Sequence, residues 1–197
     1  MSFCNSLFSI VTSCLLFALV TACSSPEVIH DLSDASFSVI NQDSAAVNFP
    51  QDFKGDYVIA AFIYTHCPDI CRITTANMKN ISKQLEDTTN VEFVEITFDP
   101  KRDTPSALKK YMQTYKLNPT QFTMLTGEPV VIDSLMSQVG IQAAVSYVDT
   151  TQSGDVQYTM NHTDRILIMD PQGRVRFQYP GSMVPPKNVI EDLNKLR

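Results

Sequence analysis

The order of apolar and polar residues along the chain predicts several β-strands. Apolar and polar positions alternate over 37–39 and 47–49, which predicts a short β-hairpin near the start of the domain. Runs at 58–64 and 91–98 are mostly apolar or β-branched, as expected of strands buried on both faces. A shorter run at 122–125 predicts another strand. Together these segments predict a sheet with a buried centre.

Apolar residues spaced three and four apart predict helices between and after these strands. The first helix follows the segment Cys67–Cys71 and runs to about Glu86. Thr104 and Pro105 are typical of an N-cap followed by proline at the first helical position, and Pro185-Pro186 opens the last helix. The apolar faces of the four predicted helices consist of Met78, Ile81 and Leu85, then Leu108, Tyr111, Met112 and Tyr115, then Ile132, Leu135, Met136 and Val139, and finally Val189, Leu193 and Leu196.

The C-terminal third of the chain contains a second predicted hairpin. Runs at 165–169 and 175–179 flank the strong turn sequence Asp-Pro-Gln-Gly at 170–173. The residues between the third helix and this hairpin show no regular pattern and are predicted to be irregular. Alternating strands and helices closed by a hairpin and a helix are typical of a thioredoxin-like α/β sandwich. We therefore predict a central mixed sheet flanked by helices, with an N-terminal β-hairpin.

The N-terminal segment predicts export. Residues 1–22 contain no charged side chain, and their apolar stretch at 7–20 is shorter than the roughly 20 residues of a membrane-spanning helix. The sequence Val-Thr-Ala-Cys that ends at Cys23 resembles a bacterial lipobox. We predict a lipoprotein signal peptide over 1–22, a lipidated N-terminus and polar tether over 23–35, and one domain over 36–197. The alternative is an uncleaved, loosely anchored N-terminal helix.

Export changes how the five cysteines are interpreted. Cys4 and Cys14 would leave with the signal peptide, and Cys23 would carry lipid, so Cys67 and Cys71 would be the only thiols of the mature protein. Both stand at the predicted start of a helix, whose partial positive charge favours thiolate over thiol. This position suits either a soft metal ion or disulfide exchange.

Composition and charge exclude one class of partner. The chain is 44% hydrophobic and 18% charged, which is ordinary for a globular domain, and its net charge is -6. An acidic chain without a basic stripe is not expected to bind nucleic acid.

The predicted location is the bacterial cell envelope, with the domain facing the periplasm or the cell exterior and held at a membrane by the lipid anchor.

Three motifs in order and spacing resemble the Sco/SenC family of copper chaperones, which have a thioredoxin-like fold and act in cytochrome c oxidase assembly. They are Tyr-Thr-His-Cys-Pro-Asp-Ile-Cys at 64–71, Phe-Asp-Pro-Lys-Arg-Asp-Thr-Pro at 98–105, and Asn-His-Thr at 161–163, which enters the strand before the turn at 170–173. The resemblance extends over 37–196. Two positions depart from the family pattern, Arg72 in place of a proline and Asn161 in place of an acidic residue. Neither change removes one of the copper ligands that the resemblance implies.

The resemblance implies a copper site made by Cys67, Cys71 and the distant His162. Two thiolates and one imidazole suit Cu(I), and they accept Cu(II) when oxygen or water ligands are added. The implied partner is the copper-binding subunit of cytochrome c oxidase or another copper-receiving protein. His66 is expected to point away from the metal, because adjacent side chains of an extended segment face opposite sides. His30 lies in the predicted tether and is not expected to bind copper.

A second function remains open from the residues themselves. Cys67 and Cys71 could act as a redox dithiol, which would make the protein a thiol-disulfide oxidoreductase. Catalysts of the thioredoxin type usually have two residues between the cysteines, whereas this chain has three. A purely structural disulfide is the weakest alternative, since closing so small a loop contributes little through chain entropy.

Overall fold

The computed structural model describes residues 26–150 and 156–197. The predicted signal peptide and the predicted lipidation site, Cys23, lie outside the described residues. Within the described ranges, no helix is both long enough and apolar enough to cross a membrane.

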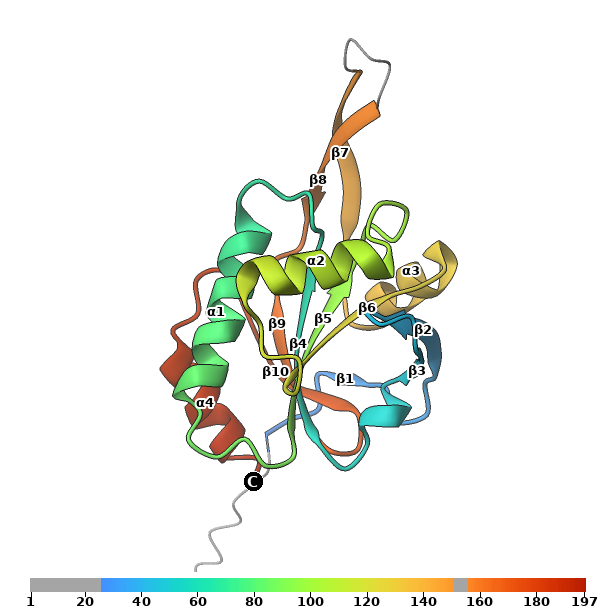
Figure 1. Cartoon of the computed structure of the whole chain (residues 1–197). Helices are drawn as coiled ribbons and strands as arrows, with labels where there is room; N and C mark the ends of the chain where they lie inside the picture. Colours follow the sequence, from blue (N-terminus) through green and yellow to red (C-terminus); the bar gives the residue numbers. More distant parts are fainter. Residues whose placement is uncertain (1–25, 151–155) are drawn as a thin grey trace, which may run out of the picture.

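An eight-stranded sheet forms the centre of the domain, in the order β1-β10-β9-β4-β5-β6-β2-β3 (Figure 1). Neighbours β4, β5 and β6 are parallel, and the remaining pairs are antiparallel. The sheet strands are β1 (His30–Asp31), β2 (Phe37–Asn41), β3 (Ala46–Phe49), β4 (Tyr57–Ile63), β5 (Val91–Thr97), β6 (Phe122–Thr126), β9 (Ile166–Met169) and β10 (Arg174–Tyr179). This mixed sheet with an N-terminal hairpin, β2–β3, confirms the predicted fold class.

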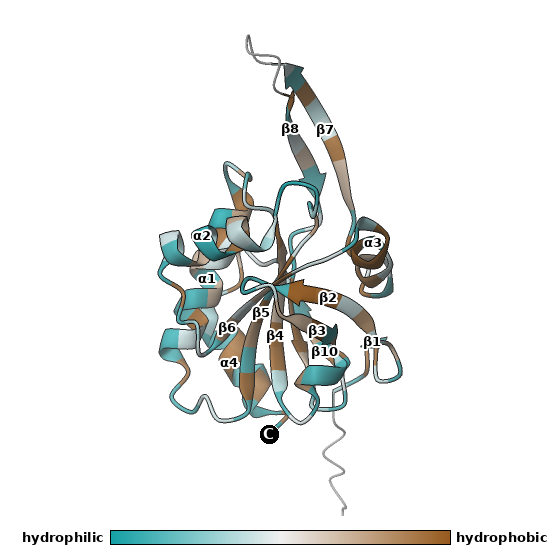
Figure 2. Ribbon diagram, turned by 45° about the vertical axis from the view of Figure 1, so that its right-hand side comes forward, coloured by the Kyte–Doolittle hydropathy of each residue, from teal (hydrophilic) through white to brown (hydrophobic). Residues whose placement is uncertain are grey.

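In the described part of the chain, four α-helices flank the sheet: α1 (Ile70–Gln84), α2 (Pro105–Tyr115), α3 (Pro129–Gln138) and α4 (Pro186–Asn194). A short 3₁₀ helix occupies Gln51–Phe53. The connections β4-α1-β5 and β5-α2-β6 advance in one direction across the sheet, and right-handed crossovers therefore place α1 and α2 on the same face. α4 packs beside α1, and α3 packs against β2 on the far side from α1 (Figure 2). The helix predictions are confirmed, including Thr104, whose side chain accepts a hydrogen bond from the N–H of Ala107.

The two central strands show why the sequence folds this way. Residues Val58–Ile63 of β4 and all of β9 are buried, because helices or loops cover both faces of the sheet there. Continuous apolar runs are the sequence pattern of such strands. Burial of these side chains removes most of the apolar surface of the central sheet from water, which is the main favourable contribution to folding.

The region predicted to be irregular contains a further hairpin instead. Strands β7 (Ala143–Thr150) and β8 (Val156–His162) pair only with each other and project from the body of the domain (Figures 1 and 2). Most of their side chains are exposed, so neither face imposes the alternation by which a half-buried strand is recognised. The prediction was wrong here because backbone pairing, not burial, defines these strands.

Two further boundaries differ from the predictions. His30–Asp31, within the stretch predicted to be a tether, forms β1 and pairs with β10, so ordered structure begins before residue 36. Only two residues long, β1 is too short to produce a sequence pattern. His162, predicted to enter a strand, instead ends β8, and β9 begins at Ile166.

One carboxyl group is buried between the sheet and the two helices on this face. Glu95 of β5 is fully buried, and its Oε2 accepts a hydrogen bond of 3.2 Å from the Thr75 hydroxyl of α1. The same hydroxyl lies 3.0 Å from the Tyr111 hydroxyl of α2. Oε1 of Glu95 has no hydrogen-bond partner among the described residues. Burial therefore raises the pKa of Glu95 to about 8, and the Thr75 hydrogen bond offsets only part of that effect.

This buried carboxyl should make stability depend on pH. Between the ordinary pKa of 4.5 and the folded value of about 8, the folded protein binds more protons than the unfolded chain, so stability falls as pH rises through that window. Glu95→Gln removes the ionisation. The difference in free energy of unfolding between Glu95→Gln and the parent should grow by about 3 kcal/mol from about pH 5 to pH 8, because only the parent loses stability through this group.

Urea unfolding of reduced, metal-free protein at several pH values measures this difference. The matched control is Glu86→Gln, which removes an exposed carboxyl just beyond α1 and should follow the parent at every pH. Equal pH dependence in the parent and in Glu95→Gln would show that Glu95 is not the responsible group.

Candidate metal centre

Three segments that are distant in the sequence meet at one edge of the sheet. The parallel strands β4 and β5 end at this edge, and the loops that follow them carry Cys67 and the segment 98–104. β9 is antiparallel to β4, with Ile166 opposite Ala61, so the residues just before β9 lie at the same edge. Ligands commonly bind at the carboxyl ends of strands in open α/β sheets. The sheet register therefore positions both sides of the candidate site.

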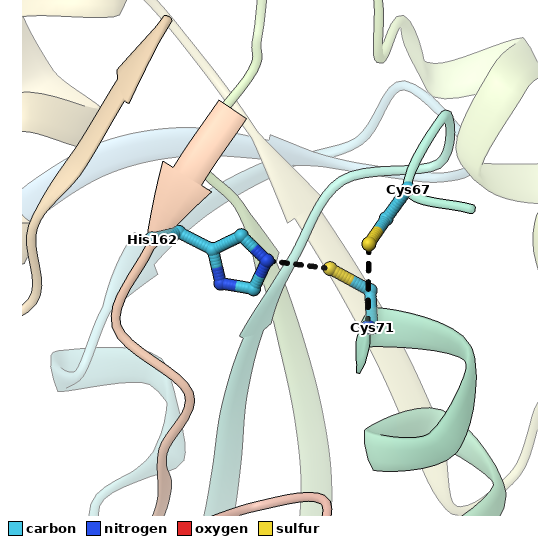
Figure 3. A group of neighbouring side chains, drawn as sticks. All are labelled: Cys67, Cys71 and His162. Atoms are coloured by element: carbon cyan, nitrogen blue, oxygen red, sulfur yellow. Dashed lines mark hydrogen bonds between the residues drawn. The ribbon is translucent and has the colours of Figure 1, made fainter. Parts of the chain in front are cut away.

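Cys67, Cys71 and His162 are brought together at this edge (Figure 3). Cys67 lies in the loop before α1, Cys71 in the first turn of α1, and His162 at the end of β8. The Cys71 Sγ and the His162 Nε2 are 3.6 Å apart, and the Cys71 N–H donates to the Cys67 Sγ at 3.4 Å. The two sulfurs and one ring nitrogen all lie within 4.8 Å of one another. Their role as metal ligands stays a prediction, and the geometry is compatible with it.

The imidazole of His162 is held from two directions. Its Nδ1 lies 3.2 Å from the carbonyl oxygen of Thr163, which accepts a hydrogen bond when Nδ1 is protonated and leaves Nε2 free to face the sulfurs. The ring packs against Phe98, with centroids 4.7 Å apart, and edge-on against Tyr64 at 5.9 Å. A ligand ring fixed in this way needs little reorganisation to bind a metal.

A polar clamp, formed by Asp99, Arg102 and Tyr158, fastens the β7–β8 hairpin to the domain. The Tyr158 hydroxyl donates to Asp99 at 2.6 Å, and Arg102 donates to Asp99 at 2.5 Å and to the Tyr158 carbonyl at 3.0 Å. The Arg102 guanidinium also stacks 3.4 Å from the centre of the Tyr158 ring. Because His162 ends the same strand as Tyr158, the clamp fixes the approach of the imidazole to the sulfurs.

A second buried carboxylate holds the loop before Cys67. Asp103 is fully buried and accepts hydrogen bonds from the Thr65 N–H at 3.0 Å, the Thr65 hydroxyl at 2.5 Å and the Thr97 hydroxyl at 2.6 Å. His66 is exposed, and its ring contacts Thr65 instead of the two sulfurs. His30 lies in β1, outside the cluster.

The two thiols differ in acidity. The hydrogen bond from the Cys71 thiol lowers the pKa of Cys67 to about 3. The contact with His162 and the hydrogen bond from the Cys71 N–H also lower this pKa, whereas burial raises it. Cys71 donates that hydrogen bond and is buried, so its own pKa is raised. For His162, burial favours the neutral ring, but the contact with Cys67 and the hydrogen bond to Thr163 outweigh it and raise the pKa. Of the two sulfurs, Cys67 is therefore the one that favours the thiolate form.

The arrangement can support two kinds of chemistry. Two sulfurs and an imidazole nitrogen form a compact, soft donor set that suits copper. A thiolate beside a second thiol can also exchange with a disulfide. Sequence reasoning did not assign a role at the site to Arg102, although it stands in one of the quoted motifs. The only available signal was that motif, since the pairing with Tyr158 depends on the tertiary structure.

The fold and the site together define a class of protein, a thioredoxin-like domain with a cysteine pair and a distant histidine at the end of its central strands. The SCO1/SenC family pattern matches residues 29–197. The chain belongs to the SCO1/SenC family.

Individual relatives agree with this membership. The chain is 27% identical over 187 residues to the SCO1 protein homolog of Bacillus subtilis, covering 93% of each chain. It is similar to a SCO1/SenC family lipoprotein from Bacillus anthracis, with 28% identity, a TM-score of 0.71, and coverage of 88% of this chain and 99% of the other. It is also similar to copper-bound ScoI of Bradyrhizobium japonicum, with 26% identity, a TM-score of 0.69, and coverage of 88% and 100%.

Proposed function

We propose that this protein is a membrane-tethered copper metallochaperone. The observation that carries the proposal is the cluster of Cys67, Cys71 and His162, whose ligand atoms lie within 4.8 Å of one another. The B. japonicum relative has a copper-bound structure, which supports copper as the cargo. Cu(I) is the form that the two sulfurs and one nitrogen favour, and Cu(II) would require added oxygen ligands.

Delivery would proceed by ligand exchange. The copper would pass from the two sulfurs and the imidazole to the ligands of a receiving protein, with the thiols detaching in turn and the oxidation state unchanged. The receiver implied by the family resemblance is the copper-binding subunit of cytochrome c oxidase. Both thiols must be reduced for loading, because a disulfide has no thiolate to offer the metal.

Substitution of each ligand tests the copper site. Cys67→Ser, Cys71→Ser and His162→Ala each remove one donor, so copper affinity should fall by a hundredfold or more, beyond the roughly 10–100-fold loss typical of changes outside the ligand shell. Competition with a chromophoric Cu(I) chelator measures the affinity, and X-ray absorption reports the ratio of sulfur to nitrogen ligands.

The matched control is His66→Ala, which removes a nearby but exposed imidazole and should bind copper as the parent does. If all three ligand variants keep the parent's stoichiometry and spectrum, copper does not bind at this cluster.

The acidity of Cys67 favours a second candidate function, thiol-disulfide exchange with a client protein. The Cys67 thiolate would attack the client disulfide, forming a mixed disulfide and releasing one client thiolate. Cys71 would then give its proton to the client thiolate already released and attack the Cys67 sulfur, closing an internal disulfide and releasing the second client thiolate. Two electrons pass from the dithiol to the client. The residue proposed as the attacking thiolate is the one with the lowered pKa.

Trapping separates the two functions. Cys71→Ser lacks the resolving thiol, so an exchange mechanism predicts a mixed disulfide through Cys67 that is seen on a non-reducing gel and released by dithiothreitol. Cys67→Ser should trap far less client, because Cys71 is buried and its burial, which the substitution does not remove, raises its pKa. Copper-dependent association with no covalent adduct would instead support delivery and exclude the exchange reaction.

We also propose a lipid anchor at Cys23, which places the domain at the face of a membrane in the cell envelope. The lipobox-like sequence before Cys23 and the relative described as a lipoprotein support this. The carbonyl of Pro26 accepts a hydrogen bond of 2.9 Å from the Arg176 Nε, so the ordered domain begins close to the proposed anchor. Acyl chains contribute about 0.8 kcal/mol of membrane affinity per buried methylene, which makes multiple acylation a firm anchor.

Substitution of the acylated cysteine tests the anchor. Cys23→Ser should move the protein from the membrane fraction to the soluble fraction and remove the lipid from its intact mass. Cys14→Ser is the control and should remain anchored. A parent protein that retains Met1 and carries no lipid would contradict the proposal.

A further inference from the structure

A groove beside Cys67 has no role in the functions proposed so far. It lies between α1 and α2 and has a volume of about 440 Å³. Cys67 contributes to its wall, together with Arg72 of α1 and Lys110, Tyr111 and Tyr115 of α2. Of the three proposed copper ligands, only Cys67 lines this groove. The groove is therefore a separate approach to one side of the site.

The charged residues lining this groove are both cationic. Arg72 and Lys110 are exposed, and no carboxylate lines the groove. Among the described residues, neither side chain forms a salt bridge, whereas the adjacent Lys109 is paired with Asp43 at 2.7 Å. Two uncompensated cations at one place are notable on a chain whose net charge is -6. They form a local positive site on an acidic protein.

Aromatic residues orient one of these cations. The Arg72 Nε donates a hydrogen bond of 3.0 Å to the Tyr115 hydroxyl, and among the described residues its terminal N–H groups have no hydrogen-bond partner. The Tyr111 and Tyr115 rings pack with centroids 4.4 Å apart. A guanidinium offers a planar fork of donors that matches a carboxylate in a bidentate manner. The wall thus combines two cations with a pair of packed aromatic rings.

We propose that the groove binds an acidic peptide segment of the protein that receives copper from this site. This inference rests on the proposed function and adds the chemistry by which the receiver is recognised. A peptide fits better than a small molecule, because both cations of the groove are exposed, whereas sites for small ligands usually enclose most of the ligand surface. The overall negative charge does not prevent docking, since charges beyond about 8 Å are screened at physiological ionic strength.

The position of the groove determines how such a segment meets the site. A peptide bound across Arg72 and Lys110 reaches the metal centre at Cys67, whereas Cys71 and His162 lie outside the groove. Cys67 is then the first ligand that an incoming donor replaces, with Cys71 and His162 still holding the cargo. The acidic segment therefore selects the partner and sets the order of ligand exchange.

Calorimetric titration of reduced, metal-free protein with a short peptide of glutamate and serine tests the proposal. Binding should be measurable at physiological ionic strength and should weaken about tenfold in the double variant Arg72→Gln/Lys110→Gln, which removes both cations that the peptide carboxylates would contact. The matched control is Lys109→Gln/Lys187→Gln, which removes the same charge outside the groove and should bind as the parent does. Equal weakening in both double variants would indicate non-specific attraction and overturn the proposal.

A footprint locates the bound peptide. Alkylation of Cys67 by iodoacetamide should slow several-fold when the peptide is present in the parent, and should be unaffected in Arg72→Gln/Lys110→Gln. Unchanged alkylation in the saturated parent would place the peptide elsewhere and overturn the proposal. Glutarate is titrated in parallel, and binding as tight as that of the peptide would assign the groove to small dicarboxylates instead.

Copper binding is measured separately on the same proteins. The parent and both double variants should bind copper equally, because Arg72 and Lys110 are not among the proposed ligands. A parent that fails to bind copper contradicts the proposed function, and a parent that binds copper but not the peptide contradicts the docking groove. The two failures are therefore distinguishable.

Discussion

The antiparallel pairing of β9 with β4 is the constraint on which the site depends. Ile166 lies opposite Ala61, which brings the start of β9 to the edge where β4 ends. Residues 91 positions apart can then meet, and the Cys71 Sγ and the His162 Nε2 approach to 3.6 Å. All four side chains of β9 are buried, so close packing against the core on both faces of the sheet holds this register. Core packing thus sets the geometry of the site.

Polar contacts hold the hairpin and the loops that carry the residues of the site. The polar clamp of Asp99, Arg102 and Tyr158 joins the projecting hairpin to the loop after β5, and Asp103 holds the loop before Cys67. A hairpin with mostly exposed side chains has little burial to keep it in place, so these directional contacts decide where its end lies. The motif at 98–105 therefore supports the site without contributing a ligand.

Metal binding and redox chemistry would use the same two sulfur atoms. The hydrogen bond from the Cys71 thiol lowers the pKa of Cys67, and the same hydrogen bond together with burial raises the pKa of Cys71. Since a disulfide and a copper ion exclude each other here, the oxidation state of the pair would control loading. The groove on the Cys67 side would add recognition of the receiver to this control.

Much of the fold could be predicted, because strands buried on both faces and helices with one apolar face leave periodic patterns. The predicted strands at 58–64 and 91–98 match β4 and β5 closely for this reason. β1 and the β7–β8 hairpin could not be predicted, since backbone pairing forms them with little burial. For the site, the sequence by itself determined the close pair Cys67 and Cys71, but it pointed to His162 only through family resemblance. Only the tertiary structure decided how His162 reaches them, because that distance depends on pairing between strands far apart in the chain.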